Sequence, residues 1–477
     1  MECADGNCTV AAAVKLGGRE QMGKQARGRL NNHMAQQKIE DDRDRVLECV
    51  RLSSDGAGVC FDQGLATFVP GMLPGEKGTV QIIQRKKNWQ RGRLLQLEEK
   101  SAQRVEPPCP VYEECGGCQL QHMTYEETLK WKRQWVEDAL RRIGKVETEV
   151  KPVIGMEEPR RYRNKAVLHR NGNIGYYQGG SHEVVVFPDC LLLSKEMNQW
   201  VQVLKKGLGD QFQEIKKITL RQSVLPSGEI KGLALLERVE DGQELPREEA
   251  DSSAKRWAAM VKEAGSLGLR EIWGINPRGE LVRLAGDQEL KSRICGIDFS
   301  LSPLAFLQVN SRQTEVLYAE ALRMADLKGG EEVWDLYCGI GTLTLALAKQ
   351  GAKVTGVEEN PHAIDSAWKN AEDNGFTQVS FIEGKVEEKI SELSQSSKPE
   401  VVVLDPPRAG MELQVIEVLE KVGPERIVYV SCDPGTLARD VELLVQRGYM
   451  VEEVQPVDMF PWSVHVECVV LMSRVEK

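Results

Sequence analysis

The sequence predicts an α/β fold in its C-terminal part, a β-barrel near its N-terminus and a mixed α+β region between them. Three observations lead to this division. Strand and helix patterns alternate from residue 301 to 477, short apolar segments separated by turn signals fill residues 43–104, and residues 105–300 combine one long helical pattern with strands. Residues 1–42 are polar and lack periodicity, so we expect a disordered leader there.

Composition limits the class of protein. The 477 residues are 41% hydrophobic and 28% charged, which is typical of a soluble globular protein. The net charge of −10 argues against binding nucleic acid by bulk charge alone, but leaves room for local basic faces. No apolar run approaches the roughly 18 residues that span a membrane, and the N-terminus lacks a signal-peptide pattern. We therefore expect a cytoplasmic protein with no membrane association and no obligate protein partner.

The segment 43–104 is basic within an acidic chain, with eleven Lys or Arg residues against seven Asp or Glu. Its expected strands include Val46–Val50, Ala66–Val69 and Gly78–Ile83, bounded by turn signals. A small barrel with clustered bases around an aromatic residue is a common design for binding nucleic acid, and an ordinary solvated strand face is the alternative. The cluster consists of Arg85, Lys86, Lys87, Arg91 and Arg93 around Trp89.

The region 105–300 begins with a helix expected from Thr124 to Ile143, where apolar residues recur at helical spacing. A second basic group with nearby tyrosines follows, which either binds RNA or forms a solvated strand face. The group comprises Arg160, Arg161, Arg163, Lys165, His169 and Arg170, with Tyr162, Tyr176 and Tyr177.

Alternation from residue 301 onward predicts a doubly wound, Rossmann-like parallel sheet. Helices are expected over 342–350 and 361–374. The expected strands are Val333–Leu336, Lys353–Val357, Val379–Ile382, Val401–Leu404 and Ile427–Val430.

A glycine-bearing loop, Asp335–Gly341, joins the first of these strands to the first helix and allows the backbone to approach a ligand closely. Glu358 ends the next strand and is placed to accept hydrogen bonds from ribose hydroxyls. The Gly-x-Gly-x-x-Gly form that binds a pyrophosphate is incomplete, so S-adenosylmethionine fits better than NAD. A structural turn with a surface Glu is the alternative.

Two further strand ends carry candidate chemistry. Asp405 precedes Pro406-Pro407 after the fourth strand, where a carboxylate can position a nucleobase or the cofactor; alone, it would also suit methylation of an amino group.

Cys432 follows the fifth strand, where ligands bind in open α/β sheets. A cysteine that adds to carbon 6 of a pyrimidine makes carbon 5 nucleophilic, and a base then removes the carbon 5 proton. Glu467 is the candidate base and His465 its rival. A buried structural cysteine is the alternative reading of Cys432.

These motifs resemble those of the S-adenosylmethionine-dependent RNA 5-methyluridine methyltransferases, and the resemblance extends over nearly everything from residue 43. It implies a class I methyltransferase domain and a TRAM-like, OB-like RNA-binding barrel. It also implies Cys432 as nucleophile and Glu467 as proton acceptor. One departure is Asp433, where the family more often has Asn. The implied cofactor-binding residues are Gln308, Tyr337, Glu358 and Asp405.

Four cysteines have metal-ligand spacing: Cys109, Cys115 and Cys118 are clustered, and Cys190 lies further on. By ligand count they suit zinc or an iron–sulfur cluster. The spacing is similar to that of family members with a 4Fe–4S cluster, so we expect such a cluster with a structural role.

The resemblance to the ribosomal-RNA branch implies 23S rRNA as substrate, with the T-loop uridine of tRNA as the alternative. Two rivals belong to other classes: an RNA-binding protein with an inactive methyltransferase domain, and a DNA cytosine methyltransferase. The combination of Cys432, Glu467, Glu358 and Asp405 argues against the first. The position of Cys432 after the fifth strand, rather than the fourth, argues against the second.

Overall fold

The computed structural model describes residues 44–225, 227–238, 259–260, 262–275, 279–286 and 289–475. The leader expected over residues 1–42 lies outside these residues. The chain divides into two compact units, which are considered separately. The first holds the described residues up to Arg104 together with Gly179–His182, and the second holds the rest.

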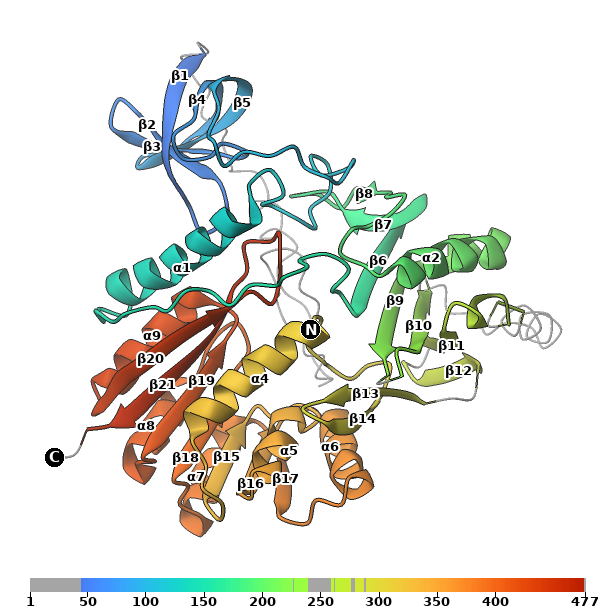
Figure 1. Ribbon diagram of the computed structural model, residues 1–477, viewed down its shortest axis with the longest axis vertical. Helices are drawn as coiled ribbons and strands as arrows, with labels where there is room; N and C mark the ends of the chain where they lie inside the picture. The colour runs from blue at the N-terminus through green and yellow to red at the C-terminus, as the bar shows by residue number, and fades with distance from the viewer. Residues whose placement is uncertain are drawn as a thin grey trace, which may run out of the picture. The chain divides into compact units, whose positions relative to one another are not determined.

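The first unit contains a closed five-stranded barrel with strand order β1-β2-β3-β5-β4, which confirms the predicted barrel (Figure 1). Inward-facing apolar residues such as Leu47, Val69 and Val80 form its core. Within it, Glu76 is fully buried and accepts hydrogen bonds from Arg104, which lowers the pKa of the Glu76 carboxyl. The strands are β1 Arg45–Leu52, β2 Gly58–Asp62, β3 Leu65–Val69, β4 Lys77–Arg85 and β5 Trp89–Glu99.

The second unit begins with helix α1, Tyr125–Arg142, as the sequence predicted. A seven-stranded sheet of order β12-β11-β10-β9-β6-β7-β8 follows, with α2 Lys195–Leu208 packed against it and a 3-10 turn, η1 Gly209–Glu214, after that helix. Its strands are β6 Lys165–Asn171, β7 Asn173–Tyr177, β8 Val184–Val185, β9 Ile215–Val224, β10 Ile230–Arg238, β11 Leu269–Ile275 and β12 Leu281–Ala285. A hairpin, β13 Leu290–Ile294 and β14 Ile297–Leu301, leads to the C-terminal sheet.

The C-terminal sheet has the order β17-β16-β15-β18-β19-β21-β20. Five strands run parallel, which confirms the predicted strands, and the sheet continues with β21, which is antiparallel to both β19 and β20. The strands are β15 Glu332–Leu336, β16 Lys353–Glu358, β17 Val379–Glu383, β18 Val401–Leu404, β19 Arg426–Ser431, β20 Tyr449–Val457 and β21 Glu467–Arg474.

Helices cover both faces of this sheet, because successive buried residues of each strand point to opposite sides. Val401 and Val403 pack with α4, α5 and α6, whereas Val402 and Leu404 pack with α1, α7, α8 and α9 (Figure 1). The helices are α4 Ser311–Ala325, α5 Thr342–Lys349, α6 Pro361–Asp373, α7 Val386–Ser396, α8 Leu413–Val422 and α9 Pro434–Val445.

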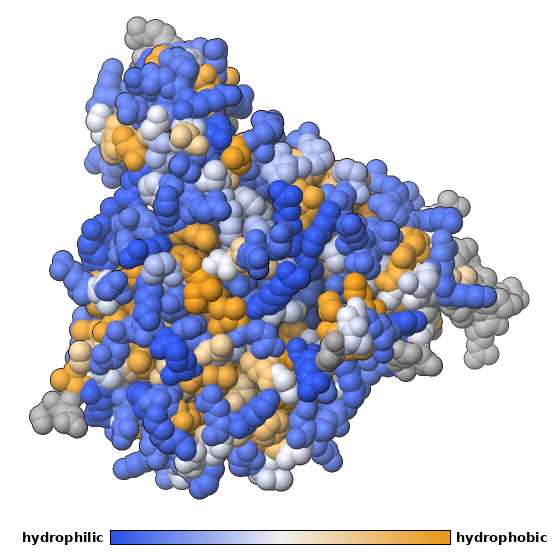
Figure 2. Space-filling model, in the orientation of Figure 1, coloured by the Kyte–Doolittle hydropathy of each residue, from blue (hydrophilic) through white to orange (hydrophobic). Residues whose placement is uncertain are grey.

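Hydrophilic residues cover most of the visible surface of the barrel and of the second unit, with apolar residues showing in smaller groups (Figure 2). Two exposed apolar side chains belong to the segment between β14 and α4: Leu304 is 49% exposed and Phe306 is 58% exposed. None of the helices in the described part of the chain has the length and apolarity needed to cross a membrane.

Candidate active site

The loop between β15 and α5 forms one wall of a pocket. Gly339 and Gly341 adopt left-handed conformations, with φ of 56° and 79°, which favour glycine. A Cβ atom on Gly341 would lie 3.1 Å from the ring of Phe381, whereas one on Gly339 would meet open space. The backbone at Gly339 is therefore free to face a ligand, and the backbone at Gly341 closes against the core.

Glu358 ends β16 and holds this loop. Its carboxylate accepts a hydrogen bond from the Gly339 amide at 3.1 Å and another from the Asn360 amide at 2.9 Å. Each carboxylate oxygen keeps further capacity to accept bonds, so Glu358 can serve both the loop and a ribose. The sequence prediction located this residue at the right strand end but did not foresee its bond to the glycine loop.

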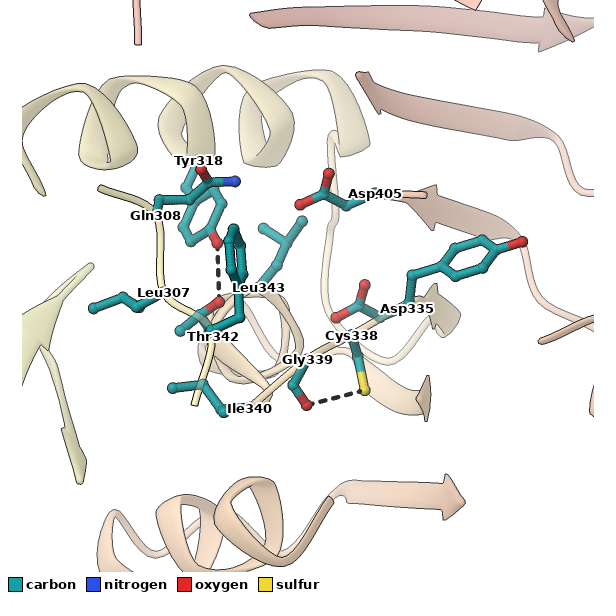
Figure 3. Close-up of a pocket in the computed structure, with 12 residues that line it drawn as sticks. Leu307, Gln308, Tyr318, Asp335, Cys338, Gly339, Ile340, Thr342, Leu343 and Asp405 are labelled. Atoms are coloured by element: carbon teal, nitrogen blue, oxygen red, sulfur yellow. Dashed lines mark hydrogen bonds between the residues drawn. The ribbon is translucent and has the colours of Figure 1, made fainter. Parts of the chain in front are cut away.

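Polar and apolar side chains together line this pocket (Figure 3). Its polar groups include Gln308, from the segment before α4, and Asp405, which directly follows β18. The hydroxyl groups of Tyr318 and Thr342 lie 2.9 Å apart on its wall. Apolar parts of the lining come from Phe306, Leu307, Ile340 and Leu343.

Two buried carboxyl groups give the pocket its electrostatic character. Burial raises the pKa of Asp335 to about 6, although Thr344 donates a hydrogen bond to it at 2.5 Å. Burial, and then repulsion from Asp335, raises the pKa of Asp405 to about 7. A cation bound in the pocket would relieve this repulsion, so the site favours a positively charged ligand.

Cys432 and Glu467 come together at the adjoining end of the sheet. Ser431 of β19 pairs with Cys468 of β21, so Cys432 and Glu467 lie one residue beyond the last pair of this ladder, and they interact electrostatically. Opposite residues of such a pair point to the same face of a sheet. The structure thus brings together the two residues that the sequence proposed as nucleophile and base.

Both groups favour their protonated forms in the absence of ligands. Burial, followed by repulsion from Glu467 and Asp405, raises the pKa of the Cys432 thiol to about 12. Glu467 is 2% exposed, and burial with repulsion from Asp405 raises the pKa of its carboxyl to about 8. Within the described residues, Oε2 of Glu467 has no hydrogen-bond partner. A general base that works near neutral pH needs a pKa close to neutral, and the raised pKa of Glu467 lies in that range.

Arg408 lies close to Cys432 and Glu467, and its sequence pattern had not indicated a role in the site. Its positive charge opposes the rise in the pKa of both Cys432 and Glu467 and so offsets part of the effect of burial. Its Nη2 atom lies 3.3 Å from Nε2 of His465, and burial and then the Arg408 charge lower the pKa of that imidazole to about 4. An imidazole with so low a pKa is a weak proton acceptor, so the electrostatics of the site favour Glu467 over His465 as the candidate base.

Asp433 explains the tight turn after Cys432. Its side chain accepts hydrogen bonds from the amides of Gly435 and Thr436, both at 2.9 Å, and so caps α9. Pro434 occupies the first turn of the helix, where its fixed φ is favourable. Asn and Asp are equally good caps, so the departure at Asp433 preserves the turn.

The four cysteines with metal-ligand spacing all belong to the second unit and are half-buried. Cys118 and Cys190 pack in one cluster, and interactions among the thiols raise the pKa of Cys115, Cys118 and Cys190 in addition to the larger effect of burial. Across the described ranges, however, no three His, Cys, Asp or Glu side chains are arranged closely enough to hold a metal ion. The thiols fit a metal site in composition and neighbourhood, but their spacing is not that of a formed site.

The second basic group proves to be divided between different surroundings. Arg161 forms an ion pair with Asp189 and donates to the carbonyl of Cys190 at 2.8 Å. Tyr162 is buried, and Tyr176 stacks on Phe187. The rings of His169 and Tyr177 stack with centroids 4.0 Å apart. Part of the group therefore serves the packing of the unit.

Comparisons with known proteins agree with this site. The family described as tRNA (Uracil-5-)-methyltransferase matches residues 296–475, which include the pocket, Cys432 and Glu467. An uncharacterized RNA methyltransferase of Halalkalibacterium halodurans is 39% identical over 92% of this chain and 99% of its own length. The chain belongs to the RNA uracil-5-methyltransferase family. A second relative, an uncharacterized RNA methyltransferase of Bacillus cereus, is 40% identical over 89% of this chain and 95% of its own.

A solved structure supports the same assignment across the fold. The tRNA (uracil-54, C5)-methyltransferase of Pyrococcus abyssi, in complex with S-adenosyl-L-homocysteine, superposes with a TM-score of 0.71 at 27% identity. The match covers 89% of this chain and 99% of the other. This family member is therefore an S-adenosylmethionine-dependent RNA methyltransferase, and the pocket beside Asp405 is the candidate site for that cofactor.

Proposed function

We propose that the protein methylates carbon 5 of a uridine in structured RNA through a covalent bond between Cys432 and the uracil. The observation that carries the proposal is that Cys432 and Glu467 lie just beyond the last pair of β19 with β21, where Cys432 interacts electrostatically with Glu467 and with Asp405 of the pocket. Methylation of an exocyclic nitrogen requires no cysteine, whereas methylation of carbon 5 requires a nucleophile at carbon 6.

The residues divide the reaction into defined steps. The Cys432 thiolate adds to carbon 6 of the uracil, and the electrons of the 5,6 double bond move toward the carbonyl oxygen at carbon 4. Gln308, Tyr337, Glu358 and Asp405 would hold S-adenosylmethionine, which when bound would supply the methyl group for carbon 5 and leave as S-adenosylhomocysteine. Glu467 then removes the proton from carbon 5, the double bond forms again, and the thiolate leaves.

Generation of the thiolate depends on the charges in the site. The raised pKa of Cys432 means that the thiol is almost wholly protonated at neutral pH when no ligand is bound. A positively charged sulfonium beside Asp405 would offset the negative charge that raises this pKa, and Arg408 acts in the same direction. We infer that cofactor binding prepares the nucleophile.

The barrel is proposed to bind the RNA, as a TRAM-like module. Arg85, Lys86, Lys87, Arg91 and Arg93 are all exposed along the β4–β5 hairpin and strand β5. The rings of Trp89 and Phe68 meet edge to face at 6.1 Å within the same unit. Exposed basic side chains suit phosphates, and aromatic rings, here half-buried, suit stacking with unpaired nucleobases. The target uridine must leave its stack to reach Cys432, so we expect a flipped base.

Our first candidate for the RNA is 23S rRNA, on the combination of a basic barrel with clustered cysteines. A uridine of tRNA is the second candidate, because the solved relative is named for tRNA uracil-54. A cytoplasmic location follows from either substrate.

For the cysteines we propose that Cys109, Cys115, Cys118 and Cys190 ligate a 4Fe–4S cluster of structural role, with zinc as the alternative. Binding would require the thiols to draw closer than they lie at present. Iron and acid-labile sulfide analysis of anaerobically purified protein, together with its visible absorption, distinguishes the two metals. Stoichiometric zinc, or no metal, would overturn the cluster.

The experiment that tests the proposed function uses transcripts of unmodified 23S rRNA and tRNA with methyl-labelled S-adenosylmethionine. We expect label in 5-methyluridine from one of the two RNAs with the wild-type protein, and none with Cys432→Ala, which should still bind the cofactor. Methylation by Cys432→Ala would overturn the covalent mechanism.

A further inference from the structure

The connection between β20 and β21 carries five successive backbone carbonyl groups that accept hydrogen bonds from several other segments of the second unit. This segment, Asp458 to Trp462, precedes His465 and Glu467 in the chain, and Figure 1 shows the connection in red beside α1. The donors are Gln313 Nε2 to Asp458 at 3.1 Å, Asn310 Nδ2 to Met459 at 3.0 Å, Lys132 Nζ to Phe460 at 3.0 Å, Tyr162 Oη to Pro461 at 3.1 Å, and the amides of Gln119 and Leu120 to Trp462, both at 3.0 Å.

The lysine that binds the Phe460 carbonyl also forms a buried ion pair with Asp458. The side chains of Lys132 and Asp458 are both fully buried, and Lys132 Nζ lies 2.5 Å from Asp458 Oδ1. Tyr125 donates to the other carboxylate oxygen at 2.7 Å, and its hydroxyl accepts from the Met156 amide at 2.8 Å. A buried ion pair seldom adds much stability compared with apolar residues of the same volume. What it supplies here is a fixed position for the backbone at Phe460.

The other attachments come from segments with roles in the proposed reaction. Asn310 and Gln313 follow the candidate cofactor residue Gln308 and begin α4. The amides that hold Trp462 directly follow Cys118 in the chain. Trp462 itself adopts φ of 67°, a left-handed conformation that is costly for a bulky residue and persists only where its surroundings enforce it. Its indole N–H donates to the Pro159 carbonyl at 2.7 Å.

We propose that Lys132, Asp458 and Tyr162 are positioning residues for the proton acceptor Glu467, and that the segment Asp458 to Trp462 is a rigid support for the end of β21. This inference rests on the proposed function, because it assigns Glu467 the removal of the carbon 5 proton. Glu467 is the first residue of β21 and pairs with Val457 of β20, the residue that directly precedes this segment. If the segment loosens, the base shifts while Cys432, which directly follows the separate strand β19, remains in place.

The proposal predicts a specific kinetic defect. Addition of Cys432 and methyl transfer precede proton removal, so a displaced base leaves the methylated uracil attached to the protein. We expect Lys132→Met to lower turnover by about 100-fold and to accumulate an RNA–protein adduct that withstands denaturing electrophoresis. Tyr162→Phe removes one hydroxyl and preserves packing, so we expect a smaller loss, about fivefold, with the same adduct.

Matched variants separate positioning from folding. Lys130→Met changes an exposed lysine of the same helix, with a side chain 71% exposed, and should behave as wild type. The double variant Lys132→Met with Asp458→Asn removes both buried charges together. We expect it to regain the melting temperature lost in Lys132→Met and still to accumulate the adduct, because the bond to Phe460 remains absent.

The same assay, with unmodified 23S rRNA and tRNA transcripts, is applied to wild-type protein and to Glu467→Gln. The results separate a failure of the positioning role from a failure of the proposed function. If Glu467→Gln traps the adduct but Tyr162→Phe and the double variant release product as fast as wild type, the positioning role is wrong and the proposed function stands. If Glu467→Gln turns over normally, the role of Glu467 as base and the positioning role both fail, whereas 5-methyluridine formed by neither RNA with the wild-type protein would overturn the proposed function itself. Variants whose adduct formation and product release fall in equal proportion would show a purely structural role and overturn the proposal.

Discussion

Replacing Glu467 with Gln tests whether burial sets the protonation of the candidate base. The pKa of this carboxyl is raised from 4.5 to about 8, first by burial and then by Asp405. Because the folded protein binds this proton more tightly than the unfolded chain, the group contributes stability that is complete below about pH 4.5. That contribution is lost as the pH rises to about 8. Each pKa unit corresponds to about 1.4 kcal/mol, so the loss between pH 4.5 and pH 7 amounts to about 3 kcal/mol.

The assay compares the free energy of unfolding of wild-type protein and Glu467→Gln in urea, without ligands, at pH 5 and at pH 8. A glutamine side chain does not titrate, so the variant lacks this pH-dependent loss. We expect the difference between the two proteins to shift by about 3 kcal/mol in favour of the variant across this range. Any constant cost of burying the amide cancels in this comparison. Stability profiles that run parallel would refute the reasoning, because they would show that Glu467 ionises normally in the folded protein.

Further predictions concern the pH profile, the cofactor pocket and the barrel. Because the base must be ionised, kcat/KM should rise with pH through about 8, and a profile that is flat from pH 6 to 9 would contradict this. Glu358→Gln should weaken S-adenosylmethionine binding about tenfold, measured by calorimetry; an unchanged Kd would exclude its role with the ribose. Gly341→Ala should lower Tm by a few degrees, since its φ of 79° disfavours a side chain; an unchanged Tm would argue against this. Lys86→Ala with Lys87→Ala should reduce the slope of log RNA affinity against log salt by about 1.5, whereas the exposed Lys328→Ala should leave it unchanged; equal slopes would contradict a phosphate contact.

Local sequence signals predicted much of the C-terminal sheet. The strand at Val401–Leu404 was predicted to the residue, because four consecutive buried aliphatic residues are typical of a central parallel strand. Cys432 and Glu467 were chosen from motifs, and the register of β19 with β21 brings them together. The antiparallel direction of β21 was missed, because strand direction depends on the connection and not on the composition of the strand.

Residues that act through distant partners were beyond the sequence analysis. Lys132 contacts Asp458 across more than three hundred positions, and a lysine at that point of an amphipathic helix gives no sign of burial. Arg408 was part of a recognised motif, but its proximity to His465 depends on a turn between separate strands. The cysteine pattern predicted that four cysteines lie close together. The fold packs Cys118 and Cys190 against one cluster, but spacing along the chain does not determine the distances between sulfur atoms.

The most direct test of the account is the identity of the atom that bonds to RNA. Transcripts in which uridine is replaced by 5-fluorouridine would be incubated with the protein and S-adenosylmethionine, and the product would be digested and mapped by mass spectrometry. Fluorine at carbon 5 cannot be removed as a proton, so the intermediate should persist as a methylated nucleotide attached to Cys432. An adduct on another residue, or methylated RNA with no adduct at all, would contradict the covalent mechanism.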